Sequence, residues 1–352
     1  MKFSPLTLKR FRRFRSIRRG WWSFLLLVAL YALSLVAELF ISHRALLVSY
    51  QGDLRFPTYG AVIPGRTFGL DYDGETNYRE LKQRLSETGD GWVLLPPVPY
   101  SPRENDFTEG LTHPAKPLQN GHLLGTDNTG RDVFARLVYG FRITMSFALA
   151  FALGTFVIAT VLGCAMGYFG GFVDLFGQRL VEIWTNLPFL YMVIIAVAVV
   201  PSDLPVGYKV AMLLTIMVVF SWSEKAQFMR AATLKEKGRD YVAAVRLTGA
   251  GAGRIIFRHI LPNTTATLVT FLPFTVASAI SSLTALDFIN FGLPRPMPSW
   301  GELLEIGLAT SSNAPWIVTS TFVAISSVLL LVTFVGEAVR EAFDPKRFST
   351  YQ

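Results

Sequence analysis

The chain has 352 residues, of which 51% are hydrophobic and only 16% are charged. This composition excludes an ordinary soluble domain of this size and favours a membrane protein. The net charge of +8 does not indicate nucleic-acid binding, because the positive residues cluster beside apolar runs and no basic stripe with interleaved stacking aromatics occurs. Anionic lipid headgroups and membrane orientation explain these charges better.

The number of cysteines, the spacing of the histidines and the absence of a phosphate-binding loop exclude several kinds of site. Cys164 is the single cysteine, so one chain can form neither a disulfide nor a Cys-based metal site. The histidines His43, His113, His122 and His259 lack metal-ligand spacing, so we expect no metal site. No Gly-x-x-x-x-Gly-Lys-Ser/Thr loop occurs, so this chain cannot hold ATP by that route. We therefore expect no catalytic and no cofactor-binding residue.

The N-terminal region predicts a membrane anchor. Residues 1–20 contain eight Lys or Arg residues and predict a basic cytoplasmic N-terminus. Residues 21–41 form an apolar run broken only by Glu38, which is long enough to cross the hydrocarbon core. The run is longer than a usual signal-peptide core and lacks a small-x-small cleavage site, so it predicts an uncleaved helix.

Residues 42–142 predict a small extracytoplasmic α+β insertion. They are rich in Gly, Pro and aromatic residues, and they contain short alternating runs such as WVLLPPVPY and one helical pattern, NYRELKQRLSETG. Near the end of the insertion, GTDNTGRD carries two aspartates, but the EF-hand calcium pattern fails there. Composition instead predicts a turn before a helix that starts near Asp132.

Five further apolar stretches bring the predicted number of membrane spans to six. The fourth is the shortest, because only 14 residues separate Lys209 from Glu224, but its helix can begin near Leu204 if Lys209 snorkels. In the second span, Gly163 and Gly167 form a small-x-x-x-small pair that can pack closely on a neighbour. The five stretches are residues 143–173, 183–202, 210–223, 260–286 and 306–336.

The positive residues predict the orientation of these spans. Lys and Arg number 8 before the first span, 1 between the second and third, 8 between the fourth and fifth, and 3 at the end, whereas the two short loops on the other face hold only Lys209 and Arg295. By the positive-inside rule both termini are cytoplasmic. The core then covers residues 143–338, with a cytoplasmic loop at 224–262 and a tail at 339–352.

The cytoplasmic loop contains YVAAVRLTGAGAGRIIFRHILPN, which predicts two short helices joined by a sharp reversal. Three glycines in GAGAG permit the reversal, and Pro262 lacks the amide that would continue the second helix unbroken. We call residues 240–259 the elbow. A simpler interpretation is that its positive charges only follow membrane orientation and touch lipid headgroups. Two faces stand out, a small one (Tyr241, Ala244, Val245, Thr248) and a basic one (Arg254, Arg258) that suits an acidic groove of a protein partner.

These strings resemble the permease subunits of bacterial ATP-binding-cassette importers, in the branch for dipeptides, oligopeptides and nickel. That family carries Glu-Ala-Ala, Gly and Leu-Pro at fixed spacing, and this chain matches it at Ala244, Gly249, Leu261 and Pro262. Ala243 stands where the family has Glu, and Val245 replaces an Ala. Any role of that Glu in binding the ATPase therefore cannot be assigned to this chain.

The resemblance extends over almost all of residues 125–345. Four segments resemble the corresponding segments of the family: LGTDNTGRDVFARLVYG, YFGGFVDLFGQRLVEIW, LDFINFGLPRPMPSWGELL and GEAVREAFDP. Similarity to the Yej-type peptide and microcin C permeases is found in four further places: RRGWWS, LLVSYQGDLRFP, GWVLLPPVPY and Asp287.

The resemblance implies an all-α polytopic fold of six helices, the type I importer permease. Its partners would be a second, homologous permease, two ATPase modules that can be one fused chain and that would bind ATP and Mg²⁺, and a periplasmic peptide-binding protein. The cargo would be peptides, including microcin C-like peptide-nucleotides, with nickel or another small solute as the alternative. The residues implied to couple the chain to the ATPase are Asp240, Tyr241, Ala244, Gly249, Arg254, Arg258, His259, Leu261 and Pro262.

Other functions fit the sequence less well. An ion-coupled carrier is disfavoured because the predicted spans lack buried charges. An intramembrane enzyme would need Gly-x-Ser-x-Gly, paired aspartates or a His cluster, none of which is present. A mere membrane anchor would not need six spans. Asp287, near the outer end of the fifth span, is a candidate gate residue that could meet a substrate amine, or else a helix-end cap.

Overall fold

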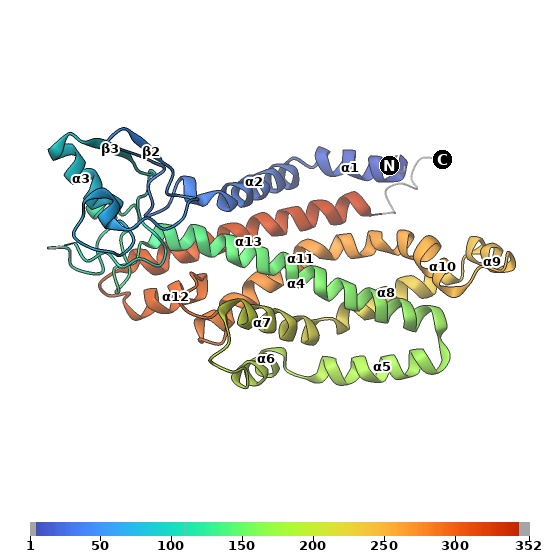
Figure 1. The fold of residues 1–352 in the computed structure, drawn as a ribbon. Helices are drawn as coiled ribbons and strands as arrows, with labels where there is room; N and C mark the ends of the chain where they lie inside the picture. Colours follow the sequence, from blue (N-terminus) through green and yellow to red (C-terminus); the bar gives the residue numbers. More distant parts are fainter. Residues whose placement is uncertain (1–4, 109, 345–352) are drawn as a thin grey trace. The chain divides into compact units, whose positions relative to one another are not determined.

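The structure is a computed structural model that describes residues 5–108 and 110–344, and Figure 1 shows its helices and strands. Parts of the predicted basic N-terminus and tail, residues 1–4 and 345–352, lie outside the described residues. The chain divides into two compact units, which are described separately. Unit 1 comprises Met1–Val28, Thr144–Pro294 and Ser326–Gln352, and unit 2 comprises Ala29–Ile143 and Arg295–Ile325.

Helices make up nearly all of the described part of unit 1. Three long helices, α2 (Arg18–Leu35), α4 (Val133–Phe169) and α13 (Pro315–Phe343), contribute residues to both units. The others are α1 (Pro5–Ser16), α5 (Gly171–Asn186), α6 (Phe189–Ala198), α7 (Val206–Ser221), α8 (Ser223–Lys237), α9 (Asp240–Leu247), α10 (Ala252–Ile255), a π-helical turn (Ile256–Ile260) and α11 (Leu261–Phe288).

The described residues contain up to five candidate membrane spans, not the six that the sequence predicts. Three helices are long and apolar enough to cross a membrane: α4, α13 and the Leu268–Phe288 part of α11. Two bent helix pairs, α5 with α6 and α7 with α8, complete the set. The predicted first span forms α2, but this helix begins on Arg18 and ends at Leu35. Because Arg18 and Arg19 lie in its first turn and the helix ends at Leu35, α2 is not one of the candidate membrane spans.

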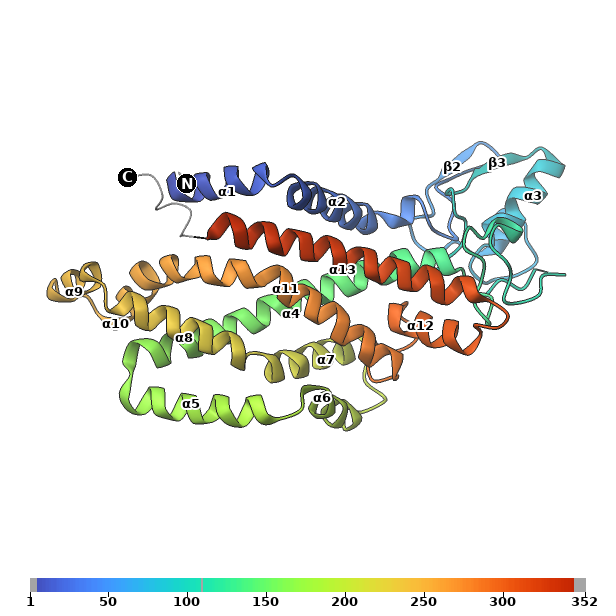
Figure 2. The same ribbon diagram turned by 180° about the vertical axis from the view of Figure 1, so that it is seen from behind.

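Two predicted spans are interrupted. The third, residues 183–202, is broken between α5 and α6, which meet at 83°, and Figure 2 shows α6 turned away from α5. Pro188 explains the break, because it lacks a backbone N–H and holds Leu187 in an extended conformation (φ −78°, ψ 127°). The sixth, residues 306–336, contains the end of α12 (Trp300–Ala309) and most of α13, separated at residues 310–314.

The fourth span begins earlier than its apolar run. Helix α7 starts at Val206, close to the start near Leu204 that a snorkelling Lys209 would allow. The Lys209 Nζ donates a hydrogen bond to the Ser202 carbonyl at 2.7 Å, so the cation satisfies backbone at the helix start. At the other end, α7 meets α8 at 50°.

Glycines bring α4 and α8 together in unit 1. A Cβ added at Gly163 would lie 2.5 Å from the Met229 Cβ, and one at Gly167 would lie 2.7 Å from the Thr233 Cβ. Any side chain at these positions would therefore separate the helices. The close packing expected of this glycine pair is confirmed, and its partner is α8.

Unit 2 contains a small antiparallel sheet covered by a helix. Its strands run in the order β2 (Asp53–Arg55), β1 (Leu47–Tyr50) and β3 (Gly91–Leu94). Val48 of β1 is paired with Arg55 and Val93, and it is buried against Leu81 and Leu85 of α3 (Tyr78–Thr88). Alternation along the strands sends every second side chain to this core. The strand and the helix predicted within residues 42–142 are both present.

Candidate functional site

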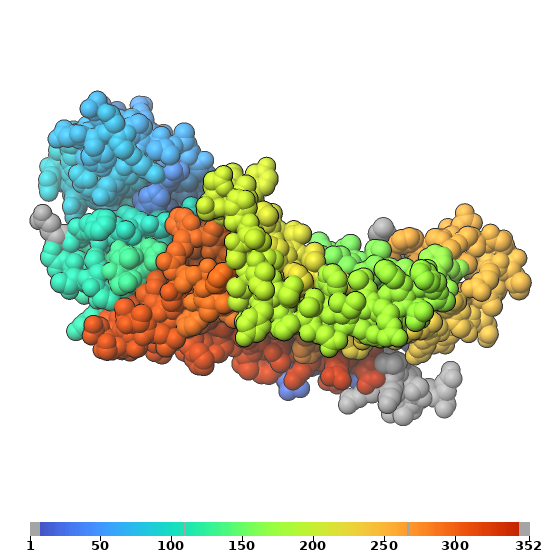
Figure 3. All heavy atoms as spheres, turned by 90° about the horizontal axis from the view of Figure 1, so that it is seen from below, coloured from blue at the N-terminus to red at the C-terminus, as the bar shows by residue number. Residues whose placement is uncertain are grey.

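The elbow, residues 240–259, is built from α9, α10 and most of the π-helical turn that leads into α11. Figure 1 places α9 and α10 beyond the ends of α8 and α11, and the light-orange atoms of this segment form one end of unit 1 in Figure 3. π-Helical turns within longer helices are frequent at functional sites. The predicted bend is therefore a defined structure that projects from the helices that carry it.

A left-handed glycine makes the reversal between α9 and α10. Gly249 has φ +76°, and its N–H donates to the Arg246 carbonyl at 3.0 Å. An added Cβ at Gly249 would meet no atom within 4 Å, so glycine is needed here for its backbone angle and not for space. The same freedom leaves this side of the turn open to a partner.

The root of the elbow is buried in unit 1. Val242 of α9, Ile255 of α10 and Ile260 of the π-helical turn are at most 1% exposed, and they pack with Met229 of α8 and Cys164 of α4. Each fully buried aliphatic side chain contributes roughly 1.5–3 kcal/mol. A force applied to the elbow would therefore be passed to α4 and α8 instead of bending a loose loop.

Tyr241 ties the start of the elbow to its two neighbouring helices. Its hydroxyl donates to the Glu236 Oε2 of α8 at 2.7 Å and accepts from the Asn263 Nδ2 of α11 at 3.0 Å. Burial, followed by the hydrogen bond to Glu236, raises the pKa of Tyr241. The phenol thus stays neutral and fixes both ends of the elbow.

The outward side of the elbow combines apolar and cationic groups. Leu247 is 90% exposed and Phe257 is 69% exposed, in a segment that lies outside the candidate membrane spans and so has no lipid core to cover it. Arg254 and Arg258 are also exposed, and neither forms an ion pair within residues 5–108 and 110–344. Apolar anchors beside unpaired guanidinium groups are typical of a protein-docking surface.

The structure places the predicted coupling residues in two groups. Tyr241 and Val245, which the sequence predicts on the small face, are half-buried and pack against the root. Tyr241 and Val245 are turned toward the neighbouring helices, and the Tyr241 hydroxyl contacts α8 and α11. His259 and Leu261 are also half-buried, whereas the exposed members are Asp240, Ala244, Gly249, Arg254, Arg258 and Pro262.

Ala243 is exposed on α9, beside Ala244. It occupies the position where the resembled permeases carry Glu, so this surface has no carboxylate there. Leu247, one turn further along α9, is the most exposed large apolar side chain of the described residues. Sequence inspection overlooked Leu247 and Phe257, although apolar residues in a basic loop predicted to be cytoplasmic were a usable signal.

Asp287 is buried at the last turn of α11. Its Oδ1 accepts a hydrogen bond from the Leu293 N–H at 2.6 Å, which closes the turn that follows the helix. A Cβ at Gly292 would lie 1.9 Å from the same oxygen, so the turn is built closely around this carboxylate. This geometry favours the helix-end interpretation of Asp287 over the gate interpretation.

Unit 2 holds a network of buried charges in the segment that precedes and begins α4. Asp127 accepts from the Thr129 N–H at 2.8 Å and from the Arg131 Nε at 2.8 Å, which makes the predicted turn. Arg136, 1% exposed, bridges Asp127 and Glu302 of α12. Burial opposes ionisation of Asp127, but Arg136 and Arg131 outweigh it and lower the pKa of Asp127.

His122 forms a second buried group beside this network. Its Nδ1 lies 2.7 Å from the Asp132 Oδ2 and its Nε2 lies 3.0 Å from the Asp106 Oδ2, and the ring stacks on Tyr100 at 3.8 Å. Both ring nitrogens can donate only in the imidazolium form. Burial would lower the pKa of His122, but the two carboxylates outweigh it and raise the pKa.

The carboxylates around His122 also shape the chain. Asp132 Oδ1 accepts from the Ala135 N–H at 2.6 Å and caps α4, so the helix start predicted near Asp132 is confirmed. Burial acts against the charge of Asp106, but hydrogen bonds from Thr108 and His122 bring its pKa to about 2. Sequence inspection treated His122 as an isolated residue and did not find this group.

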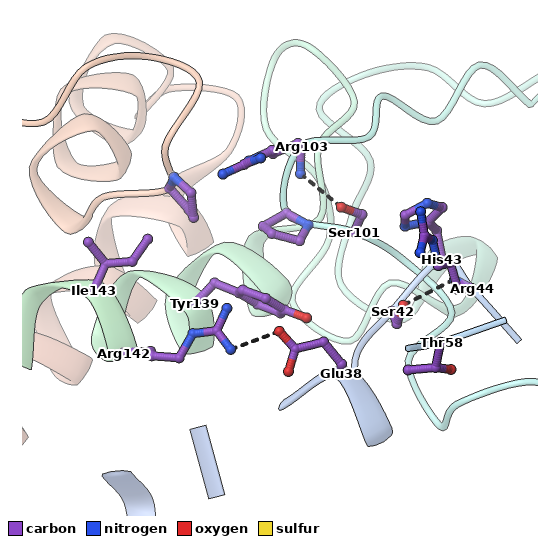
Figure 4. Close-up of a pocket in the computed structure, with 12 residues that line it drawn as sticks. Glu38, Ser42, His43, Arg44, Thr58, Ser101, Arg103, Tyr139, Arg142 and Ile143 are labelled. Atoms are coloured by element: carbon purple, nitrogen blue, oxygen red, sulfur yellow. Dashed lines mark hydrogen bonds and ion pairs between the residues drawn. The ribbon is translucent and has the colours of Figure 1, made fainter. Parts of the chain in front are cut away.

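Unit 2 also contains a polar cavity of about 300 Å³, shown in Figure 4. Arg142 reaches Glu38 at 2.8 Å across its floor, and Arg44 is paired with Glu75 at 2.6 Å. Two of the three guanidinium groups that line the cavity are thus neutralised, and the third, on Arg103, is exposed to solvent. The cavity can admit a small polar group, but it has no strong preference for an anion.

Comparison with known proteins relates the chain to transport permeases. Residues 159–349 match the family described as binding-protein-dependent transport system inner membrane component. The chain is 38% identical to the peptidoglycan transport system permease protein YejE of Agrobacterium fabrum, over 98% of this chain and 94% of that protein. It is also 38% identical to the inner membrane ABC transporter permease protein YejE of Escherichia coli, over 98% of this chain and 99% of that protein.

A more distant relative is the oligopeptide transport system permease protein OppC of Lactococcus lactis, 35% identical over 66% of this chain and 78% of that protein. The dipeptide permease DppC of Haemophilus influenzae is 33% identical over 72% of this chain and 85% of that protein. The two YejE matches cover 98% of this chain and therefore include the elbow as well as the segments of unit 2. The chain therefore belongs to the binding-protein-dependent inner-membrane permeases of ABC transporters and, within them, to the YejE-type branch of the OppC and DppC family.

Proposed function

We propose that this chain is one of two permease subunits that carry peptides into the cell, and that its elbow docks on the ATPase. As a member of its family, the chain is a non-catalytic inner-membrane component of a system that also has a binding protein and an ATPase. The observation that carries the proposal is the contrast within the elbow. Its root is buried, whereas Leu247 and Phe257 are left open on its outward side.

Docking of the elbow would convert ATPase closure into movement of the spans. Val242 and Ile255 fix the elbow to α8 and α4, and Tyr241 holds it to α11. When the ATPase modules close on nucleotide, they would carry the elbow with them and tilt these helices, so that the path opens to one side of the membrane at a time. Such coupling requires that the docking surface fit the two ATPase states differently.

The proposed topology places the elbow and both termini in the cytoplasm. Its support is the distribution of positive residues, 8 before the first predicted span and 8 between the fourth and fifth. In this topology α2 would be a sixth span, and the sheet of unit 2 would lie outside the cytoplasm. A second, homologous permease would complete the path.

The proposed cargo is a solute with peptide bonds. The names of the relatives refer to peptidoglycan, oligopeptide and dipeptide transport, and a peptide chain is common to all three cargoes. Peptides and the peptide-bearing fragments of peptidoglycan are therefore the first solutes to test. Nickel and microcin C-like peptide-nucleotides are the alternatives to include.

Reconstitution of the complete transporter tests the proposal. The chain, the second permease, the ATPase and the binding protein would be placed in lipid vesicles, and ATP hydrolysis would be measured with each solute. We expect hydrolysis and uptake to depend on the binding protein and to be stimulated by peptides. Full activity without this chain, or stimulation by Ni²⁺ and not by peptides, would contradict the subunit assignment and the cargo assignment respectively.

A further inference from the structure

Helix α1 is held along the end of a candidate membrane span. Phe14 of α1 is buried against Val335, Ala338 and Ala342 of α13, and Figures 1 and 2 show α1 beside the last turns of that helix. Arg13 lies 3.8 Å from Glu341, and the Arg10 guanidinium lies 4.9 Å above the Phe343 ring. These contacts all lie within unit 1, and they fix which side of α1 faces α13.

The opposite side of α1 presents a mixed basic and apolar surface. Leu8 is 45% exposed and Phe11 is 52% exposed, and Lys9, Arg12 and Arg15 are exposed as well. At 3.6 residues per turn, Leu8, Lys9, Arg12 and Arg15 lie about 100° or more around the helix from Phe14, whereas Phe11 is only about 60° from it and lies at the edge of this surface. We call these five side chains the basic face of α1. Neither Lys9 nor Arg12 has an ion pair among the described residues.

The charge balance around α1 is strongly positive. Residues 5–37 contain seven Lys or Arg residues and no Asp or Glu. Within the described part of the chain, Glu341 and Glu337 pair with Arg13 and Arg19, at 3.8 and 3.3 Å, so most of these cations lack a carboxylate partner. These unpaired cations lie beside the C-terminal end of α13. There a candidate membrane span would pass from the hydrocarbon core into the headgroup region.

We propose that the basic face of α1 binds the headgroups of anionic phospholipids in the leaflet that surrounds this end of α13. Clusters of Lys and Arg beside a span attract anionic headgroups, and each cation near the membrane surface raises the affinity about fivefold. Leu8 lies among these cations and Phe11 lies at their edge, and both would enter the boundary between headgroups and acyl chains, as in interfacial helices. A purely electrostatic protein contact would not need these two apolar side chains.

The test uses the full chain, purified in detergent and mixed with equal amounts of phosphatidylglycerol and phosphatidylcholine. Mass spectrometry would count the bound lipids of each kind. We expect the native chain to prefer phosphatidylglycerol, and the triple variant Lys9→Gln, Arg12→Gln, Arg15→Gln to lose at least about tenfold of that preference. Added salt should weaken the native preference in the same direction.

Two further variants separate charge from folding. The triple variant Arg66→Gln, Lys82→Gln, Lys116→Gln removes the same charge from exposed positions of unit 2 and should keep the lipid preference. Exchanging the cations of the basic face (Lys9→Arg, Arg12→Lys, Arg15→Lys) should also keep it. The proposal is overturned if the first triple variant prefers phosphatidylglycerol as the native chain does, if the unit 2 variant loses the preference equally, or if the basic face proves to bind an acidic protein subunit instead.

Discussion

In unit 2, Arg136 is 1% exposed and lies between two carboxylates, whereas Arg254 and Arg258 of the elbow in unit 1 are exposed and have no ion pair among the described residues. The apolar groups differ in the same way. Trp300 of unit 2 is 2% exposed and donates its indole N–H to the Leu137 carbonyl at 3.0 Å, whereas Leu247 of the elbow is 90% exposed. Groups satisfied within the chain build a fixed scaffold, and groups left open indicate where a partner binds.

The largest expected effect separates two glycines with the same backbone. Gly249 (φ +76°) in the elbow and Gly89 (φ +75°) at the end of α3 both have open space around them. We expect Gly249→Asp to reduce peptide uptake at least about tenfold, because it places an unpaired charge in the docking surface. Gly89→Asp carries the same backbone strain and should transport normally. Equal uptake by the two variants would remove the distinction between the elbow and unit 2.

Breaking the network of buried charges in unit 2 should lower the free energy of unfolding. Arg136→Met removes the buried cation between Asp127 and Glu302 and leaves the more exposed Arg131 to pair with both, which costs about 3 kcal/mol in the free energy of unfolding. Arg103→Met, at an exposed position of the same unit, should cost less than about 1 kcal/mol. Unfolding followed by tryptophan fluorescence would compare the two. Similar losses would show that the network is no more important than surface charge.

The pH dependence of stability should come from His122. The folded-state pKa of His122 is raised above the ordinary value of 6.5, so its stabilising ion pairs are fully present below that pH. They are lost as the pH rises through the folded-state pKa. We expect the native chain to unfold at a lower temperature at high pH, and His122→Gln to lack this change. His43→Gln, at a half-exposed position, is the control and should keep it.

The smallest expected effect concerns the hydroxyl of Tyr241. Tyr241→Phe removes the bonds to Glu236 and Asn263 and should cost about 1 kcal/mol in stability. If these bonds hold the elbow in place for coupling, ATP hydrolysis should also become less dependent on peptide. Tyr72→Phe, which removes an exposed hydroxyl bonded to Glu80, is the matched change in unit 2 and should leave coupling intact.

Local patterns predict much of the elbow, because glycine and proline act through the backbone nearby. Gly249 and Pro262 mark its bend and the start of α11 in the sequence alone. The direction of α9 is harder to predict, since the positions of α8 and α11 decide which way Tyr241 and Val245 face. Hydropathy also misses the break at Leu187 and Pro188, because both flanks are apolar.

The network of unit 2 depends on contacts between distant residues. Arg136 and Glu302 are 166 residues apart in the chain, and His122 meets Asp106 across 16 residues. No periodicity links such positions. Arg136 near the start of an apolar helix was nevertheless a signal, because a buried guanidinium requires a carboxylate partner.

Photo-crosslinking tests the central claim, that the elbow is the ATPase-docking surface, most directly. Benzoylphenylalanine would replace Leu247 in the elbow or, as a control, the exposed Leu54 of unit 2, in membranes that contain the complete transporter. We predict that position 247 crosslinks to the ATPase subunit, with a yield that changes when ATP is added, and that position 54 does not. Crosslinks from position 247 to lipid alone, or equal crosslinking of the ATPase from both positions, would contradict the assignment.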